Sequence, residues 1–234
     1  MAEALRGRRT PQRLLVAQGV HEDERVRRLL AAAAARAVAI ERPPRDLLDR
    51  LTQGANHQGV ALEAGPYRYA SLDEILATPG TVLVLDHIQD PQNFGTLLRA
   101  AEAAGVSGVV IPQDRAAGVT PAVVNASAGA VEHLPLARVP NLARALDALR
   151  DAGWWIVCLA TGPEARDLFT TELPSPVALV VGAEGPGIGP NVRRHCDLLV
   201  SLPMRGQVAS LNAATAGTVA LYEILRRESA SRAG

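Results

Sequence analysis

The stretch that decides the fold reads ALVVGAEGPGIGP (residues 178–190), followed after a short spacer by LLVSLPMRGQVASLNAATAGTVALYE (residues 198–223). Val177 to Val181 is an apolar, β-branched run, and such a run bounded by turn residues predicts a buried strand. Leu198 to Leu202 predicts a second buried strand for the same reason. Two loops rich in glycine, proline or asparagine therefore each follow a strand.

Each of these strands leads into a loop that a ligand can approach. Residues 182–187 form the first loop and Pro203 to Gly206 the second. Glycine at the C-terminal end of a strand lets backbone N–H and C=O groups come close to a ligand. We expect the two loops to lie on adjacent strands and to form a crevice. Ser210 to Asn212 then opens a helix that runs to the C-terminal arginines.

The sequence excludes three common ligand-binding loops. The first loop has glycines at positions 182, 185, 187 and 189, which is not the G-x-G-x-x-G of a dinucleotide fold. A Walker A loop needs a lysine, and all 24 basic residues of the chain are arginine. An ordinary methyltransferase domain places its glycine loop before a long βα series, whereas only about 45 residues follow here.

A third segment lies earlier in the chain. Residues Val82 to Pro112 read VLVLDHIQDPQNFGTLLRAAEAAGVSGVVIP. They predict a buried strand that ends at Asp86, a loop, a helix that starts at Asn93 to Gly95, and a strand over Gly108 to Ile111. Asparagine is favoured as a helix N-cap, so Asn93 has a purely structural interpretation beside a functional one.

Together the three segments resemble the three motifs of the SpoU (TrmH) family of RNA 2′-O-ribose methyltransferases. The motifs read DPQNFGTLLRAAEAAGV, VVGAEGPGIG and LPMRGQVASLNAATAGTVALYE, in family order and close to family spacing. The resemblance covers roughly Thr81 to Arg227. Three long motifs together are a specific signal, whereas any one of them alone would be weak.

The resemblance implies an α/β fold of the SPOUT α/β-knot type, with a C-terminal trefoil knot and a mainly parallel sheet. Knots are rare in proteins, so neither composition nor periodicity predicts one. The resemblance also implies a homodimer. The methyltransferase domain is expected over residues 79–234, with a linker over residues 65–78.

Residues 1–64 read as a small α/β domain. Strands are expected at Arg13 to Gly19 and Ala37 to Ile40, and helices at Glu22 to Ala35 and Arg45 to Leu51, before a last strand near residue 63. With its HQGV tetrapeptide the pattern resembles the L30e-like RNA-binding domain of many family members. Those members usually have a strand before the first helix, whereas this chain begins inside what reads as that helix, so its start is either truncated or the domain is minimal.

The charge distribution agrees with an RNA partner. Residues 1–70 hold 12 arginines and 8 acidic residues, a net charge of +4, whereas residues 71–234 carry −4. Arginine suits phosphate and base edges because its guanidinium donates two parallel hydrogen bonds. The split is consistent with one domain that presents RNA to the other.

For the catalytic site, the resemblance implies five residues of the three motifs: Asn93, Arg99, Glu184, Ser210 and Asn212. Each also has a structural interpretation, as a helix cap, a surface charge or a solvated carboxylate. We find no well-placed histidine or cysteine to take the proton of a 2′-hydroxyl. The resemblance implies that Arg99 assists this deprotonation together with a substrate phosphate. Since arginine stays protonated, our own interpretation of Arg99 is an electrostatic group that stabilises the developing alkoxide and clamps the neighbouring phosphate.

S-adenosylmethionine is the cofactor that the resemblance implies, and no metal is expected. Its adenine would contact backbone beside apolar side chains, and glycines would line its edge. The residues that the resemblance assigns to this site are Ala160, Thr161, Gly182, Ala183, Gly185, Ile188, Leu202, Met204 and Leu211.

The most specific expectation is methylation of a guanosine ribose in bacterial 23S ribosomal RNA, with S-adenosylmethionine as methyl donor. A transfer-RNA ribose methyltransferase is the alternative within the family. A catalytically inactive RNA-binding protein of ribosome assembly is the alternative from another class. It would be favoured by loss of Asn93, Arg99 or Asn212, and all three are present.

Two further features concern the compartment. Cys158 and Cys196 lack metal-site spacing and are interpreted as two isolated thiols, which suits a reducing cytoplasm. No signal peptide is visible, and no stretch has the length and apolar character of a bilayer span. We therefore expect a cytoplasmic protein that does not enter a membrane.

Overall fold

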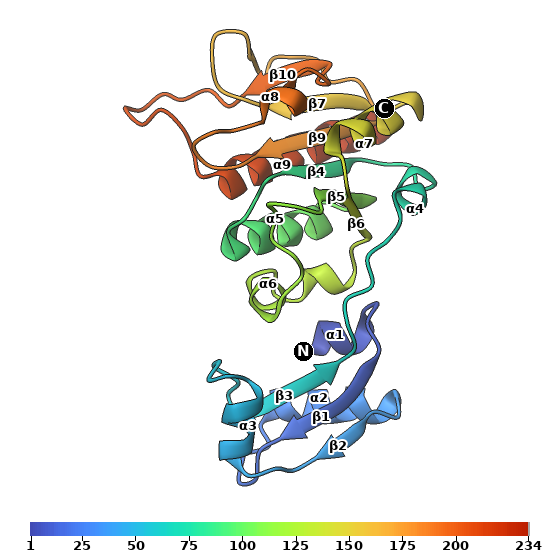
Figure 1. Cartoon of the computed structure of the whole chain (residues 1–234), viewed down its shortest axis with the longest axis vertical. Coiled ribbons are helices and arrows are strands. Elements are labelled where there is room, and N and C mark those ends of the chain that lie inside the picture. Colours follow the sequence, from blue (N-terminus) through green and yellow to red (C-terminus); the bar gives the residue numbers. More distant parts are fainter. Residues whose placement is uncertain (234) are drawn as a thin grey trace. The chain divides into compact units, whose positions relative to one another are not determined.

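A computed structural model describes residues 1–233 and divides the chain into two compact units. Unit 1 comprises Met1–Arg68, and unit 2 begins at Tyr69 (Figure 1). Among the helices of the described residues, none combines the length and the apolar character that crossing a bilayer requires.

Unit 1 is a three-stranded sheet with helices, in the sheet order β2-β1-β3. β1 pairs with β2 in parallel and with β3 in antiparallel orientation. Its elements are α1 (Ala2–Arg6), β1 (Pro11–Val16), α2 (Glu24–Ala35), β2 (Ala39–Glu41), α3 (Arg45–Leu51) and β3 (Val60–Ala64). The chain begins in a helix, as expected, and the alternation of strands and helices matches the sequence prediction.

Helix α2 starts two residues later than expected because Asp23 caps it. The Asp23 carboxylate accepts a hydrogen bond from the Val26 N–H at 2.8 Å. This bond holds the pKa of Asp23 below its ordinary value. Val26 and Leu29 on the inner face of the helix are buried against Leu14 and Val16 of β1, and this cluster is the core of unit 1.

Unit 2 contains a seven-stranded sheet in the order β6-β5-β4-β9-β7-β10-β8. Its strands are β4 (Val82–Asp86), β5 (Gly108–Pro112), β6 (Leu136–Val139), β7 (Trp155–Leu159), β8 (Arg166–Asp167), β9 (Val177–Gly182) and β10 (Leu198–Ser201). Its helices are α4 (Leu72–Leu76), α5 (Pro91–Ala103), α6 (Pro121–Ala126), a 3₁₀ turn η1 (Ala130–Glu132), α7 (Leu142–Asp151), α8 (Pro190–Arg193) and α9 (Ala213–Ala233).

All the pairings in this sheet are parallel, so the C-terminal ends of its strands meet at one edge. The sequence prediction placed β9 and β10 side by side, and this is wrong: β7 lies between them. The sequence of an apolar strand does not indicate which strand it pairs with, because a strand buried on both faces is apolar throughout. β7 consequently adds a third loop to the crevice.

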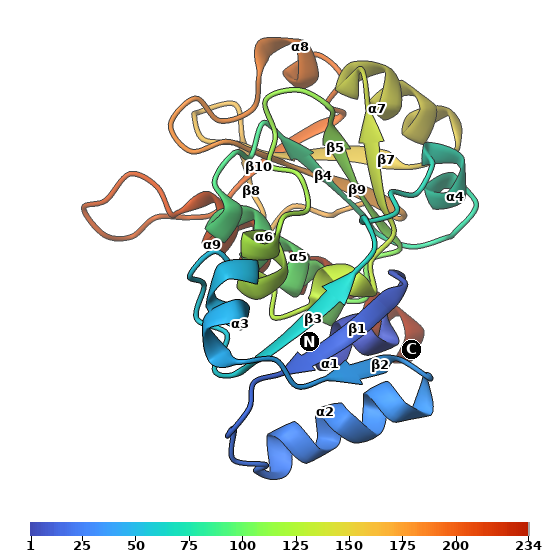
Figure 2. The same ribbon diagram turned by 60° about the horizontal axis from the view of Figure 1, so that its bottom comes forward.

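Helices cover both faces of the sheet (Figures 1 and 2). α5, α6 and α9 pack together on one face, and α7 packs with α8 on the other. The contact between α9 and α5 is close, because a Cβ placed on Gly217 would lie 2.5 Å from Cδ2 of Leu97. Glycine at this position therefore lets the last helix lie directly against the helix of the first motif.

The expected linker over residues 65–78 is in part a folded element. Residues 72–76 form α4, with Ser71 and Glu74 in a capping box. Ile75 of this helix is fully buried in the core of unit 2, beside Val82 and Val110. Leu72, Ile75 and Leu76 recur at helical spacing after the Ser71–Glu74 pair, so the sequence held a signal for this short helix that the linker prediction missed.

The two cysteines form a disulfide, Cys158–Cys196, which contradicts the prediction of isolated thiols. Cys158 lies on β7, and Cys196 lies in the turn that leads into β10. β7 and β10 are parallel neighbours, with Cys158 opposite Leu199, and this pairing brings the turn alongside β7. The argument for a reducing compartment from unpaired cysteines therefore no longer holds.

Candidate active site

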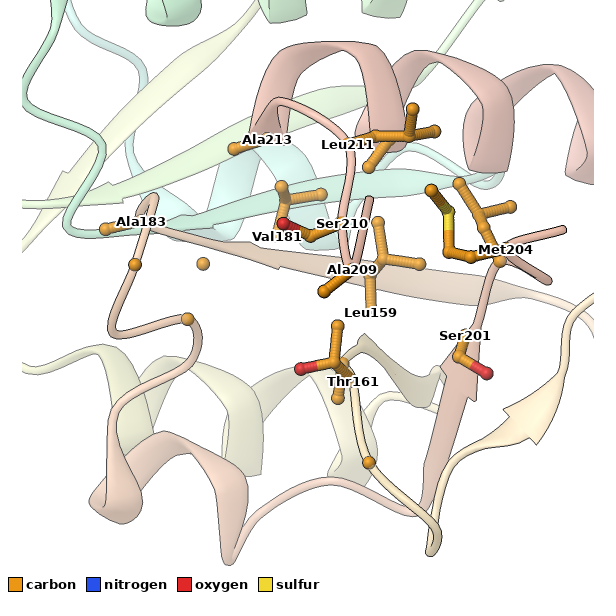
Figure 3. Close-up of a pocket in the computed structure, with 17 residues that line it drawn as sticks. Leu159, Thr161, Val181, Ala183, Ser201, Met204, Ala209, Ser210, Leu211 and Ala213 are labelled. Atoms are coloured by element: carbon orange, nitrogen blue, oxygen red, sulfur yellow. The ribbon is translucent and has the colours of Figure 1, made fainter. Parts of the chain in front are cut away.

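A pocket of about 370 Å³ opens at the C-terminal edge of β9, β7 and β10 (Figure 3). Apolar side chains of Leu159, Leu211 and Met204 face the cavity from three different segments (Figure 3). The full lining consists of Leu159, Ala160, Thr161, Gly162, Val181, Gly182, Ala183, Gly185, Gly187, Ser201, Leu202, Met204, Ala209, Ser210, Leu211, Ala213 and Ala216. The volume falls in the range of about 300–1,000 Å³ that is typical of small-molecule sites.

The glycine loop folds back on the end of β9. A Cβ on Gly182 would lie 2.3 Å from the carbonyl carbon of Gly187, so no side chain fits there. The loop is closed by a hydrogen bond of 2.9 Å from the Gly187 N–H to the Ala183 carbonyl. Gly185 and Gly187 have φ values of +80° and +67°, a conformation that favours glycine. Glycine at position 182 is thus needed for the loop itself, in addition to any approach of a ligand.

Every residue that the sequence analysis assigned to the cofactor lines this pocket, except Ile188. Ile188 is buried in the hydrophobic core with Val180 and Val192, and this packing attaches the glycine loop to the core. The sequence analysis missed some pocket residues, among them Val181 and Ala216 within the motifs and Leu159 outside them. Val181 ends a strand that had been predicted, which was the available signal.

Three of the predicted catalytic residues meet beside the pocket. The Asn212 side-chain amide donates to Oδ1 of Asn93 at 2.8 Å and to Oε1 of Glu184. Asn93 comes from α5, Glu184 from the loop after β9, and Asn212 from the start of α9. We call this set the Asn93–Glu184–Asn212 cluster. It joins all three sequence motifs, although Asn93 and Asn212 are 119 residues apart.

Asn212 also caps α9, as its structural interpretation predicted. Its Oδ1 accepts from the backbone N–H groups of Ala214 and Thr215 at 2.9 and 3.1 Å. Asn93, by contrast, is no N-cap. Asp90 caps α5 and accepts the Asn93 N–H at 2.9 Å, which frees the Asn93 side chain for the cluster.

The other two predicted catalytic residues lie apart from the cluster. Ser210 lines the pocket (Figure 3). Arg99 is exposed on α5, two turns after Asn93, and within residues 1–233 its guanidinium has no hydrogen bond or ion pair. An exposed, unengaged guanidinium on this helix is available to a polyanionic ligand.

One functional feature escaped the sequence analysis. Asp86, at the end of β4, is fully buried and lies opposite Gly182 in the sheet. Its Oδ2 accepts the Gly189 N–H at 2.7 Å, and its Oδ1 contacts Nδ1 of His87. The carboxylate therefore ties the end of the glycine loop to the first-motif loop.

Comparison with known proteins agrees with this fold and site. The profile of the SpoU rRNA Methylase family matches residues 80–222, and that of RNA 2′-O ribose methyltransferase substrate binding matches residues 2–70. The chain belongs to the SpoU/TrmH family of RNA methyltransferases, which are enzymes that depend on S-adenosylmethionine.

Relatives extend along both units. A Synechocystis protein named an uncharacterized tRNA/rRNA methyltransferase is 37% identical over 98% of this chain, and the chain spans 61% of that relative's length. A Bacillus subtilis protein, YacO, named for the TrmH family of tRNA/rRNA methyltransferases, is 38% identical over 96% of this chain and 92% of its own length.

Solved structures share the fold. An AdoMet-bound rRNA methyltransferase from Sinorhizobium meliloti has a TM-score of 0.80 at 28% identity, over 97% of this chain and 83% of that one. The SpoU methyltransferase AviRb from Streptomyces viridochromogenes, in complex with AdoMet, has a TM-score of 0.80 at 29% identity, over 97% and 86%. A structure described by the 2-OH methylation of C/U34 on tRNA has a TM-score of 0.58 at 26% identity, over 65% of this chain and 98% of that one.

The pocket residues fit the cofactor of this family. The adenine ring needs apolar walls and backbone hydrogen-bonding groups, and Leu202, Met204 and Leu211 provide the walls. The hydroxyls of Thr161, Ser201 and Ser210 are polar groups available to the ribose and the amino-acid tail. S-adenosylmethionine supplies an electrophilic methyl group when it is bound.

Proposed function

We propose that this protein methylates the 2′-hydroxyl of a ribose in RNA. The observation that carries the proposal is the Asn93–Glu184–Asn212 cluster, which lies beside the cofactor pocket and draws on all three motifs. A 2′-hydroxyl is a weak acid and a poor nucleophile, so it must be held in line with the methyl group and must lose its proton. The cluster provides amide and carboxylate groups that hold a ribose at the mouth of the pocket.

Arg99 acts in this proposal on the RNA side of the site. Its guanidinium stays protonated, so it stabilises the developing alkoxide and binds the adjacent phosphate through two parallel hydrogen bonds. Glu184 accepts the Asn212 amide and thereby fixes the orientation of that side chain. Ser210 binds the cofactor edge that faces the ribose.

Ribosomal RNA, with a guanosine in 23S rRNA as the most specific candidate, is the substrate that we favour. The structures named for rRNA methylation or for AviRb resemble this chain over 97% of its length, including unit 1. The structure named for tRNA methylation resembles only 65% of it. Transfer RNA is the alternative substrate, because the relatives' names include both.

We further propose that unit 2 contains the trefoil knot and that the protein is a homodimer in the cytoplasm. Both the knot and the dimer are what the resemblance to the family implies, and the match to its profile supports them. Light scattering that gave the mass of one chain at micromolar concentration would contradict the homodimer.

Mass-spectrometric mapping of ribose methylation tests the function. Ribosomal and transfer RNA from cells with and without the gene should differ at one nucleotide, with the missing methyl group on the ribose. A methyl group on a base would overturn the proposal. Calorimetry supplies the control for the cofactor, since S-adenosylmethionine should bind and NAD should not.

Arg99→Ala should lower methyl transfer by about 10²- to 10³-fold, as loss of one charge-stabilising donor does elsewhere. Cofactor affinity should stay within a few-fold, because Arg99 does not line the pocket. Arg99→Lys should also be poor, since an ammonium cannot make two parallel hydrogen bonds. Wild-type turnover of the alanine variant, measured with a radiolabelled methyl donor, would show that the assigned role is wrong.

A further inference from the structure

The lining of the cofactor pocket holds no acidic partner for the ribose of S-adenosylmethionine. This ribose has two neighbouring hydroxyls, and a carboxylate can accept a hydrogen bond from each of them at once. Dinucleotide-binding folds use an acidic residue for a ribose hydroxyl in this way. Among the described residues that line the pocket, none is acidic. A carboxylate that binds this ribose therefore has to reach it from the rim of the pocket.

The rim at the end of β7 carries a carboxylate, that of Glu164. Residues 162–165 read Gly-Pro-Glu-Ala and form a turn, in which the Ala165 N–H donates to the Gly162 carbonyl at 3.2 Å. Proline at the second position favours a turn of this kind. The turn brings Glu164 back towards Gly162, because a Cβ on Gly162 would lie 2.9 Å from Oε2 and 3.1 Å from Oε1 of Glu164. Since Gly162 lines the pocket, the carboxylate lies against the pocket wall.

An ion pair fixes the direction of this carboxylate. Arg193 of α8 donates from Nη2 to Oε1 of Glu164. Within residues 1–233, Oε2 of Glu164 has no hydrogen-bond partner, and the side chain is 48% exposed. The protein thus holds one oxygen of the carboxylate and leaves the other oxygen open to a ligand.

The position of Glu164 along the pocket matches the ribose of the cofactor. Two of the residues assigned to the adenine walls, Leu202 and Met204, follow β10. The loop after β9 supplies Glu184 to the cluster that, in the proposed function, holds the RNA beside the methyl group. β7 lies between β9 and β10, and Thr161 at its end faces the cavity (Figure 3). Because the ribose joins the adenine to the sulfur, its place is at the end of β7, where Glu164 lies.

The other carboxylates near the pocket follow different strands. Glu184 belongs to the cluster on the β9 side, where its Oε1 accepts the Asn212 amide. Asp167 on β8 lies opposite Ser201, and its Oδ1 accepts the Phe169 N–H at 2.8 Å, which holds the turn after β8. The acidic residue on the loop that follows β7 is Glu164.

We propose that Glu164 binds the ribose hydroxyls of S-adenosylmethionine and that Arg193 positions its carboxylate. The placement rests on the proposed function in one respect, because the methyl group is put beside the cluster that holds RNA. Each ribose hydroxyl donates a hydrogen bond to the carboxylate, and no covalent bond changes. Glu164 thereby selects cofactors that have an intact ribose.

Calorimetry without RNA tests the assignment. The ligands are S-adenosylmethionine, S-adenosylhomocysteine, and forms of S-adenosylhomocysteine that lack the 2′- or the 3′-hydroxyl. Glu164→Ala should weaken binding of the first two ligands about 10- to 100-fold, the range for hydrogen bonds to a charged group. The wild type should bind the deoxy forms more weakly than the intact form. The variant should bind intact and deoxy forms nearly equally, because it has lost the acceptor.

Two further variants separate this role from a structural one. Arg193→Ala breaks the ion pair but keeps the carboxylate, and it should weaken binding less than Glu164→Ala. Glu172→Ala removes an exposed carboxylate between β8 and β9 that does not line the pocket, and it should leave every affinity unchanged. Thermal unfolding of each variant checks that it is folded.

Each outcome decides for or against the assignment. Weaker binding in a folded Glu164→Ala variant, together with lost discrimination of the deoxy forms, supports it. Unchanged affinities, or equal losses in Glu164→Ala and Arg193→Ala with the deoxy forms still discriminated, overturn it. A loss with S-adenosylmethionine alone also overturns it, because the carboxylate would then act on the sulfonium charge that S-adenosylhomocysteine lacks. Mapping of a methyl group to a base would refute the proposed function and leave these affinities as they are.

Discussion

At the scale of single residues, Asn212 combines two tasks with two different atoms. Its oxygen caps α9, and its amide nitrogen holds Asn93 and Glu184. The two tasks can be separated by substitution, because an aspartate offers the capping oxygen without the amide donor.

Asn212→Asp should therefore retain the stability of the wild type within about 1 kcal/mol, since the cap is kept. It should nevertheless lose most methyl transfer, because a second carboxylate would face Glu184 and Asn93 would lose its donor. Asn212→Ala should lose both the cap and the activity. Thermal unfolding and methyl-transfer assays on the aspartate and alanine variants test this separation. Full activity in the aspartate variant would show that the amide contacts to Asn93 and Glu184 are not needed for methyl transfer.

At the scale of elements, Arg227 binds α9 to the segment after β8, and Glu223 on the same helix holds Arg227 in place. The Glu223 carboxylate is buried and accepts from Arg226 at 2.8 Å and from Arg227 at 2.6 Å. Arg227 also donates to the carbonyl oxygens of Leu168 and Thr171, which follow β8. The hydrogen bonds from Arg226 and Arg227 lower the pKa of Glu223 to about 2.

A pH dependence of stability follows from this lowered pKa. The contribution of Glu223 should be complete above its ordinary pKa of 4.5 and should disappear as the pH falls towards about 2, because only the carboxylate binds the arginines. Glu223→Gln should cost about 1.5–3 kcal/mol at neutral pH, as for a hydrogen bond to a charged group. Unfolding measured from pH 7 to acid should show a shallower loss in the variant; parallel curves would contradict the prediction.

The disulfide is a second fastening, between β7 and the turn before β10. It closes a loop with a sequence separation of 38 residues, and loop-closure entropy sets an upper figure of roughly 4 kcal/mol for its effect. Cys196→Ser should therefore lower the unfolding free energy by about 2–4 kcal/mol under oxidising conditions. Under reducing conditions the difference should vanish. Mass spectrometry after alkylation without reductant checks the bond directly, and two alkylated cysteines would refute it.

The sequence predicted where the strands around the site lie along the chain better than it predicted which strands lie side by side in the sheet. The strands ending at Asp86 and Gly182 were correctly expected, because apolar runs bounded by turn residues are local signals. The position of β7 between β9 and β10, and with it the cysteine pairing, depends on which strands meet. That choice is made by packing of the whole sheet, and uniformly apolar strands do not encode it locally.

The same limit explains the errors at single positions. Asn93 and Asp90 both suit an N-cap, and only the actual helix start shows that Asp90 takes this place. Ile188 belongs to a pocket motif by sequence, yet its side chain turns into the core. The link that Asp86 makes to Gly189 could not be predicted from the sequence, because it depends on the burial of the Asp86 carboxylate.

At the scale of the whole molecule, the two units differ in charge. Unit 1 matches a substrate-binding profile, and residues 1–70 carry a net charge of +4 against −4 for residues 71–234. Deleting residues 1–68 should leave a folded unit 2 that still binds S-adenosylmethionine, because the pocket lies entirely within that unit. The truncated protein should modify ribosomal RNA poorly.

Salt dependence separates affinity from chemistry in this experiment. RNA affinity of the whole chain should fall steeply with salt, because each neutralised phosphate releases counterions, and the slope should shrink after the deletion. Unchanged activity and an unchanged slope would place RNA recognition in unit 2. That result would also favour transfer RNA as the substrate.

The sheet order has a consequence for how the protein is made. β4 leaves the ribosome early, but its neighbour β9 is synthesised only after β5, β6, β7 and β8 have appeared. Until then the nascent chain presents β4 and β7 as apolar strands with unpaired edges, which are prone to wrong pairing. Long-range parallel pairing of this kind is slow to form. The centre of the sheet is therefore completed late in translation, and chaperones that shield strand edges should matter more for this chain than for one whose neighbouring strands follow in order.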